Sequence, residues 1–352
     1  MKRYLILLLF LTSYGAHATI RTVSNSPATL AQFNTIQAAV NASSSGDTIL
    51  VHGTPVFYGG FTITNKQLVI IGPGFNPDVQ FSLKATINGN VVLTGSGCKK
   101  TEIHGLHFNS SSIDVNTSMD SVYFYRNSLL GMSLVTGGGT ITGFVFKGNY
   151  FRGSISSHPF SFFHNILFEN NVFVCSNCLT NFQNGGSTNI LFNHNLFFAD
   201  DGFPSSLFSG LSLALFTNNI FVERIINSSV LQCTFINNLT FNCVVNNPWS
   251  AANGNIDGGG NIENMDPQMV DQAGVNNGTA TEISNYTIAS GPANNSGSDG
   301  KDMGVLYDPT GGLNWIHGRN TRLPSVVLMN IANPVLGAGG TLNITVEARK
   351  NE

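Results

Sequence analysis

The stretch from Asn165 to Phe198 reads NILFENNVFVCSNCLTNFQNGGSTNILFNHNLFF and contains one short phrase twice, as NILFENNVF and NILFNHNLFF. Weaker copies precede it, as VYFYRNSLL and VFKGNYF, and follow it, as LALFTNNIF and CTFINNLTF. Self-similarity at a nearly fixed period predicts a solenoid, because a unit of this size buries its apolar face only by stacking on its neighbours.

An aromatic residue marks each copy, at steps of 22, 22, 24, 24 and 19 residues. These aromatic residues are Phe124, Phe146, Phe168, Phe192, Phe216 and Phe235, and an asparagine follows each by three, at Asn127, Asn149, Asn171, Asn195, Asn219 and Asn238. Other apolar residues alternate around this pair with the period of a strand. Each repeat is therefore predicted to be a strand, a tight turn at the asparagine, which tolerates left-handed backbone, and a second short strand.

Stacked repeats place the strands of successive turns about 4.8 Å apart as parallel sheets. We therefore predict an all-β fold, a right-handed single-stranded parallel β-helix, with a phenylalanine column and an asparagine ladder inside it. A sandwich of antiparallel strands is the alternative. It has no reason to keep phenylalanine and asparagine three residues apart in every unit.

The composition is poor in charge: 10% of the 352 residues are charged, 42% are hydrophobic, and the net charge is −3. Without a basic field, nucleic acid and anionic membrane surfaces are not expected partners. The first residues, MKRYLILLLFLTSYGAHA, combine two cations, a short apolar run and a small-residue cleavage site. They predict a secretory signal peptide, too short to span a bilayer, and hence a secreted or cell-surface protein that we expect to be a monomer.

An amphipathic helix is expected within Leu30–Ser45, because Phe33, Ile36, Ala39 and Val40 fall on one helical face and would cover the open end of the solenoid. We expect the sequence to divide into a signal peptide 1–18, an N-terminal cap 19–47, coils 48–246, a terminal coil and loop-rich closure 247–310, and a C-terminal β segment or cap 311–352.

The opening IQAAVNASSSGDTILV, the repeated ILFxNN(V/L)F coils, and the segments DPQMVD and IASGPANNSGSDGKDMG together resemble secreted parallel β-helix proteins of the pectin lyase-like superfamily. The resemblance covers roughly residues 22–304. It implies a groove on one outer face in which an extended polysaccharide lies along the axis. It also implies that calcium assists catalysis if the protein is a lyase, whereas no cofactor is needed for folding. Signature motifs of polygalacturonases and pectate lyases are absent.

Charged residues just after the second strand of a repeat are the candidate catalytic groups, because a lyase or hydrolase needs carboxylates with a nearby base or cation. They are Arg152, Asp200, Asp201, Glu223 and Arg224. Asp200 and Arg224 each lie eight residues after their aromatic and should stack on adjacent coils. The alternative is an exposed ion pair of little energetic weight.

Other polar residues have structural interpretations. Lys147 and Glu169 follow the aromatic of adjacent repeats and should pair across coils. His107, His164 and His194 share no column and are expected at the surface. Of five cysteines, Cys233 should be a buried apolar residue, while Cys175 and Cys178 can form a local disulfide or face each other in a loop.

Three functions remain open from the sequence. The first is binding of extracellular polysaccharide, without catalysis that the sequence can demonstrate. The second is a polysaccharide lyase or glycoside hydrolase acting on uronate-containing glycans. The third is a structural or adhesive surface protein.

Overall fold

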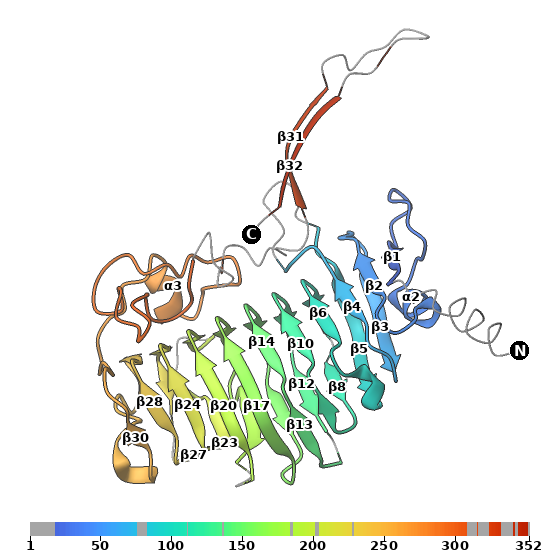
Figure 1. Ribbon diagram of the computed structural model, residues 1–352. Helices are drawn as coiled ribbons and strands as arrows, with labels where there is room; N and C mark the ends of the chain where they lie inside the picture. Colours follow the sequence, from blue (N-terminus) through green and yellow to red (C-terminus); the bar gives the residue numbers. More distant parts are fainter. Residues whose placement is uncertain are drawn as a thin grey trace, which may run out of the picture.

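The computed structural model describes residues 18–75, 83–110, 112–135, 137–183, 186–200, 204–226, 229–307, 315, 324–331, 341 and 344–350. Within them the chain forms a parallel β-solenoid (Figure 1). The predicted signal peptide lies outside these residues except for Ala18. No helix among the described residues is both long enough and apolar enough to cross a bilayer.

One long sheet, here sheet A, holds the strands that carry the phenylalanine of each repeat. Its strands, in spatial order, are β1 (Ile20–Val23), β2 (Thr48–Val51), β4 (Val69–Ile71), β6 (Glu102–His104), β10 (Tyr123–Tyr125), β14 (Val145–Lys147), β17 (Phe162–Glu169), β20 (Thr188–Asn193), β24 (Ala214–Thr217), β28 (Thr234–Ile236) and β30 (Ile256–Asp257). In addition, β13 (Thr140–Thr142) pairs with β17, and β9 (Met119–Asp120) pairs with β13.

The second long sheet, sheet B, holds the short strands after the asparagines and the strands that return across the far side. They are β27 (Val230–Leu231), β23 (Phe208–Ser212), β19 (Leu179–Phe182), β16 (Ile155–Ser157), β12 (Met132–Leu134), β8 (Ile113–Val115), β5 (Thr86–Thr94), β7 (His107–Phe108), β11 (Ser128–Leu129), β15 (Tyr150–Phe151), β18 (Val172–Phe173), β21 (Leu196–Phe197), β25 (Ile220–Val222), β29 (Leu239–Phe241) and β3 (Tyr58–Thr64). Two small pairs complete the β structure: β22 (Ser205–Ser206) with β26 (Arg224–Ile225), and the antiparallel hairpin of β31 (Pro324–Ile331) and β32 (Ile344–Lys350).

The predicted register is confirmed. Phe146 lies opposite Phe168, and Phe168 opposite Phe192, in adjacent parallel strands. Their rings stack at centroid distances of 4.8 and 4.7 Å with interplanar angles of at most 6°. A second column joins Phe151, Phe173 and Phe197, with ring centroids 4.5 and 4.7 Å apart. Burial of these side chains forms the solenoid core.

The asparagine ladder is also present, but the left-handed residue is the one before each ladder asparagine. Asn170 has φ 55° and His194 φ 53°, whereas Asn171 is fully buried and points inward. The Asn171 Nδ2 donates to Phe146 O and to Asn195 Oδ1, at 2.9 and 3.0 Å. The prediction that the ladder asparagine itself adopts left-handed backbone was wrong, because its amide is needed inside the turn.

The N-terminal helix α2 (Ile36–Ala42) is shorter than predicted. Thr35 caps it by accepting a hydrogen bond from Ala38 N, and Ile36, Ala39 and Val40 are buried as expected. Phe33 is not on the helix: it forms a parallel bridge with Val23 of β1. Because β1 pairs with β2, sheet A already begins within the segment assigned to the cap.

The chain after β30 folds back along the solenoid, over the ends of the sheet A strands (Figure 1). This C-terminal segment, residues 264–307, includes α3 (Gln272–Asn276) and buries a second apolar cluster against the outer faces of β15, β18, β21 and β25. The cluster pairs Val172, Leu196 and Ile220 of these strands with residues such as Val275 and Tyr286. One side of the solenoid is therefore covered, whereas the outer face of sheet A keeps exposed positions.

Candidate functional site

The outer face of sheet A carries a column of side chains in register over six turns. Tyr123 pairs with Val145, Val145 with Leu167, and the column continues through Leu191, Leu215 and Thr234. Each of these side chains is only partly buried, because it alternates with the inward phenylalanine. The column forms an apolar line parallel to the solenoid axis.

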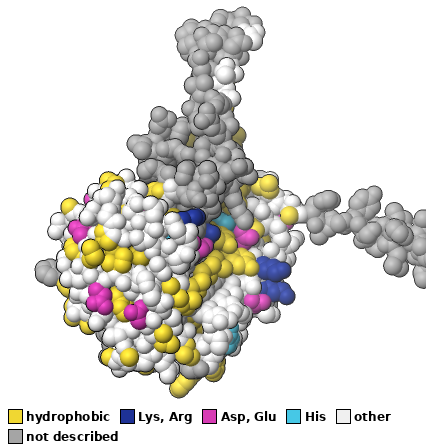
Figure 2. Space-filling model, turned by 60° about the vertical axis from the view of Figure 1, so that its left-hand side comes forward, with side chains coloured by type: hydrophobic (Ala, Val, Ile, Leu, Met, Phe, Trp, Pro, Cys, Tyr) yellow, Lys and Arg dark blue, Asp and Glu magenta, His cyan; other side chains and the backbone are white. Residues whose placement is uncertain are grey.

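A bend in each turn converts this line into a groove. Asn165, Asn189, Leu213 and Gln232 all have φ between 55° and 58°, so the chain turns sharply just before each outward leucine or threonine. Together they line a groove of about 850 Å³ with Leu167, Leu191, Leu215, Thr234 and the intervening residues. Figure 2 shows a hydrophobic band crossing this face, with charged side chains beside its upper end.

Three aromatic rings lie toward the N-terminal end of sheet A: Tyr123 belongs to the apolar column, and Tyr125 and His104 belong to the column that continues through Lys147 and Glu169. The rings of Tyr123 and Tyr125 are nearly parallel, with centroids 6.1 Å apart and an interplanar angle of 15°. The His104 ring lies 4.7 Å from that of Tyr125, and His104 Nε2 is 2.7 Å from the Glu102 carboxylate. We call Tyr123, Tyr125 and His104 the aromatic platform. It continues the groove because Tyr123 is in register with the groove floor.

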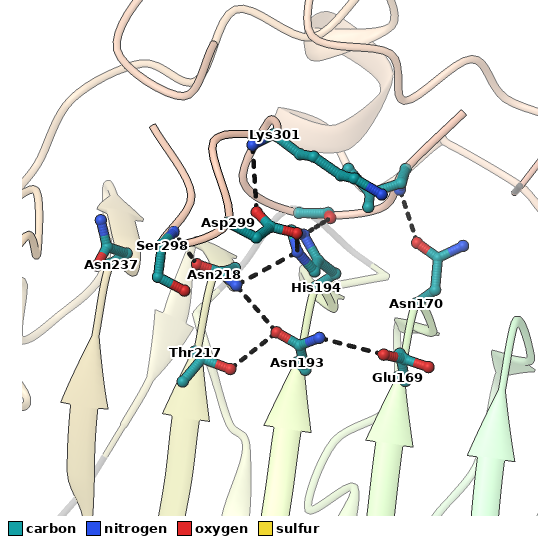
Figure 3. A network of polar contacts seen from close by, with 12 residues as sticks. Glu169, Asn170, Asn193, His194, Thr217, Asn218, Asn237, Ser298, Asp299 and Lys301 are labelled. Carbon is teal, nitrogen blue, oxygen red and sulfur yellow. Dashed lines mark hydrogen bonds and ion pairs between the residues drawn. The ribbon is translucent and has the colours of Figure 1, made fainter. Parts of the chain in front are cut away.

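A polar row runs between the groove and the C-terminal segment. Lys147 and Glu169 form the predicted ion pair, with Nζ 3.0 Å from Oε2. Asn193 donates to Glu169 at 3.2 Å and accepts from the Thr217 hydroxyl at 2.8 Å (Figure 3). These contacts order the upper edge of the groove.

The left-handed turn residues above this row bind the C-terminal segment (Figure 3). Leu306 N donates to Asn170 Oδ1 at 2.6 Å, and Ser298 N donates to Asn218 Oδ1 at 2.7 Å. His194 is fully buried between them, with Nδ1 3.3 Å from Gly304 O and Nε2 3.1 Å from Asp299 Oδ2. The prediction that His194 is a surface residue was therefore wrong, because the C-terminal segment covers it.

Arg224 is a candidate catalytic residue that the structure places in the interior. Its side chain is fully buried. Nη1 donates to Phe198 O at 3.1 Å and to the Ser205 hydroxyl at 2.8 Å, and Nη2 donates to Cys175 O. Cys175 and Cys178 form the disulfide that the sequence allowed. Arg224 thus holds two loops together inside the protein.

Asp200 does not stack on Arg224. The register places Ser205, not Asp200, opposite Arg224, because the loop after β21 lengthens that turn. Asp200 is exposed, and Asp201 lies outside the described residues.

Glu223 has left-handed backbone, with φ 52°, and its Oε2 is buried without a hydrogen-bond partner among the described residues. Burial raises the pKa of its carboxyl, against the lowering effect of a hydrogen bond with Asn242. It lies opposite no other candidate: its neighbour Val222 pairs with Phe241.

Arg152 belongs to a different group of ionisable residues, which the sequence did not connect. Its Nη2 donates to Phe108 O, so the side chain reaches back two turns, past β11, toward His107. There Lys84 Nζ lies 2.9 Å, and His107 Nε2 3.9 Å, from the Glu282 carboxylate. Burial, and then the charges of Lys84 and Arg152, lower the pKa of His107 to about 4.

The outward tyrosines and leucines of the groove were visible in the repeats but were not singled out. The signal that could have found them is the apolar residue directly before each core phenylalanine, as in YF, VF and LF, where a solvated strand would carry a polar one. Glu282 gave no such signal, because it reaches Lys84 across 198 residues of sequence.

Among the described residues, no three His, Cys, Asp or Glu side chains converge as metal ligands would. Comparisons with protein-family models, with curated proteins and with solved structures found no match to this chain.

Proposed function

We propose that this protein binds a linear polysaccharide outside the cell, along the outer face of sheet A. The observation that carries the proposal is the continuity of the aromatic platform with the groove: Tyr123 shares one in-register column with Val145 and Leu167. A ligand lying on both would run parallel to the solenoid axis.

The chemistry of this face suits a sugar chain. The rings of Tyr123 and Tyr125 are partly exposed and can pack against the apolar faces of pyranose rings, while their hydroxyl groups keep contact with water. The amides of Asn165, Asn189 and Gln232 supply donors and acceptors for hydroxyl groups along one wall of the groove. A mostly apolar floor with a few placed polar groups is the usual composition of a small-molecule or glycan site.

The sequence supports an extracellular ligand. The N-terminal residues have the pattern of a secretory signal peptide, and the repeats resemble the pectin lyase-like superfamily, whose enzymes act on polysaccharides. Extracellular polysaccharide is therefore the ligand class we propose for the groove.

The test is retention of the purified protein in native gels that contain soluble polysaccharides, neutral and uronate-rich. We expect at least one polysaccharide to retard the protein, and the double substitution Tyr123→Ala with Tyr125→Ala to abolish most of the retardation. Phe160→Ala is the control, because Phe160 is a 75% exposed aromatic residue in a turn away from the groove columns. Equal loss in the control, or no retardation by any polysaccharide, would contradict the proposal.

Glycan cleavage is the second candidate function, and the contact of 2.7 Å between Glu102 and His104 favours it. The Glu102 carboxylate, whose side chain is 20% exposed, can exchange a proton with a glycan lying beside it, and the buried His104 imidazole holds that carboxylate in place. Release of reducing ends by the wild type, lost in Glu102→Gln while gel retardation remains, is the expected result. If a polysaccharide retards the protein in the gel but no reducing ends are released, the protein binds the glycan without cleaving it.

A further inference from the structure

The groove repeats the same surface once per turn of the solenoid. Leu167, Leu191 and Leu215 stand in register on adjacent strands, and strands of neighbouring turns lie about 4.8 Å apart. That rise is close to the advance of one sugar residue in an extended glycan. A chain lying along the axis therefore meets an equivalent floor at each residue.

The wall of the groove repeats with the same period. Asn189 Nδ2 donates to Asn165 Oδ1 at 2.9 Å, so two consecutive turns present aligned, exposed amides. Each amide has donor and acceptor capacity beyond this one bond. Leu213 interrupts the amide row at the next turn, and Gln232 resumes it.

The residues that line the groove carry no formal charge, since all twelve are aliphatic, Asn, Gln or Thr. The nearby cation Lys147 is already paired with Glu169, and Glu102 adds a second carboxylate to the same face. A polyuronate placed here would lose hydration without gaining an opposite charge, which is unfavourable.

Resting on the proposed function, we infer that the groove binds an uncharged linear glycan with one sugar residue on each turn of the solenoid. The column from Tyr123 to Thr234 offers six such positions.

The experiment is titration calorimetry of the full chain with cello-, xylo- and manno-oligosaccharides of two to eight residues, and with oligogalacturonates of the same lengths. For at least one neutral series we expect affinity to rise roughly three- to ten-fold per added sugar, equivalent to about 0.7–1.4 kcal/mol, up to about six residues. Tighter binding of the oligogalacturonates at physiological salt would overturn the uncharged class. Affinity independent of length beyond two residues would overturn the register.

Leu191→Lys sharpens the test because it places a cation in the middle of the floor. Neutral oligosaccharides should bind roughly ten-fold more weakly, and oligogalacturonates should gain affinity. Leu191→Gln separates charge from shape: it should weaken the neutral series without the gain for uronates. Ser209→Lys is the matched control, at an exposed, outward position of sheet B. An unchanged preference in Leu191→Lys contradicts the inference, whereas a wild type that binds no glycan of either class contradicts the proposed function itself.

Discussion

At the residue scale, the ladder asparagines connect each turn to the next. Asn171 Oδ1 accepts from Asn149 N and from Asn149 Nδ2, at 2.9 and 3.0 Å, while its own Nδ2 donates to Phe146 O and Asn195 Oδ1. The residue is fully buried, so no water replaces these partners. One amide thus satisfies two buried backbone groups of the preceding turn and binds the side-chain amide of the following turn.

Asn171→Ala should lower the free energy of unfolding by about 3 kcal/mol, since it leaves buried donors and acceptors of neighbouring turns unpaired. The measurement is urea denaturation followed by circular dichroism. Asn90→Ala is the control: Asn90 is an exposed asparagine in β5, and its loss should change stability by less than about 0.5 kcal/mol. A similar effect of both substitutions would show that burial of the ladder is unimportant.

Glu223 should make stability depend on pH. Burial raises the pKa of its carboxyl above the ordinary 4.5, so the folded state binds this proton more tightly than the unfolded state does. The contribution to stability is present below the ordinary pKa and is lost as pH rises through the raised one. Glu223→Gln should therefore be more stable than wild type at pH 7, and the difference should vanish at pH 4. Thermal unfolding of wild type and Glu223→Gln at pH 7 and pH 4 measures this difference in stability. A stability difference that is larger at pH 4 than at pH 7 would contradict the prediction.

At the element scale, the C-terminal segment is held by single polar contacts on consecutive turns together with an apolar cluster. Asn170, Asn218 and Asn237 contact its backbone, and Glu282 and Asp299 reach from it to Lys84 and His194. Burial raises the pKa of both carboxyls, but Lys84 lowers that of Glu282 below its ordinary value, and the Lys301 N–H and His194 do the same for Asp299.

Acid should loosen this segment before it unfolds the coils. Stability from the lowered pKa values of Glu282 and Asp299 is present at pH 7 and is lost as pH falls through them. His107, with a pKa of about 4 in the fold against an ordinary 6.5, also favours opening as pH falls across that range. Hydrogen exchange at pH 7 and pH 4, corrected for intrinsic rates, should show faster exchange in 264–307 than in 162–173. Equal loss of protection in the two ranges would argue against separate loosening.

At the scale of the whole molecule, stability is approximately a sum over neighbouring turns. Phe168 stacks on Phe146 and Phe192, whereas Phe235, near the end of the stack, stacks on Phe216 and tilts against Trp249 at 6.1 Å. An interior phenylalanine therefore has two stacked neighbours and a terminal one has a single stacked neighbour.

Phe168→Ala should cost about 3–5 kcal/mol of unfolding free energy, and Phe235→Ala roughly 1 kcal/mol less. Phe160→Ala, at an exposed position, should have an effect within about 0.5 kcal/mol. The measurement is the urea midpoint of unfolding for each variant, compared at an unchanged dependence of the unfolding free energy on urea concentration. A larger cost for Phe235→Ala than for Phe168→Ala would contradict a stack of neighbouring contacts.

The sequence determined the repeating part of this protein. Phe146, Phe168 and Phe192 align, and Lys147 pairs with Glu169, because turns of nearly equal length place equal positions side by side. The same counting failed at Arg224, where one longer loop shifts its partner from Asp200 to Ser205.

Only the tertiary structure decided what covers the solenoid and what stays open. Leu306 N donates a hydrogen bond to Asn170, which lies 136 residues earlier in the sequence. The repeat spacing does not predict this contact. The C-terminal segment buries His194 and leaves the leucine groove exposed. The physical reason is that stacking depends on the number of residues between adjacent repeats, and the sequence gives this number directly. The path of a non-repeating segment depends instead on apolar and polar surfaces that form only after the turns have stacked.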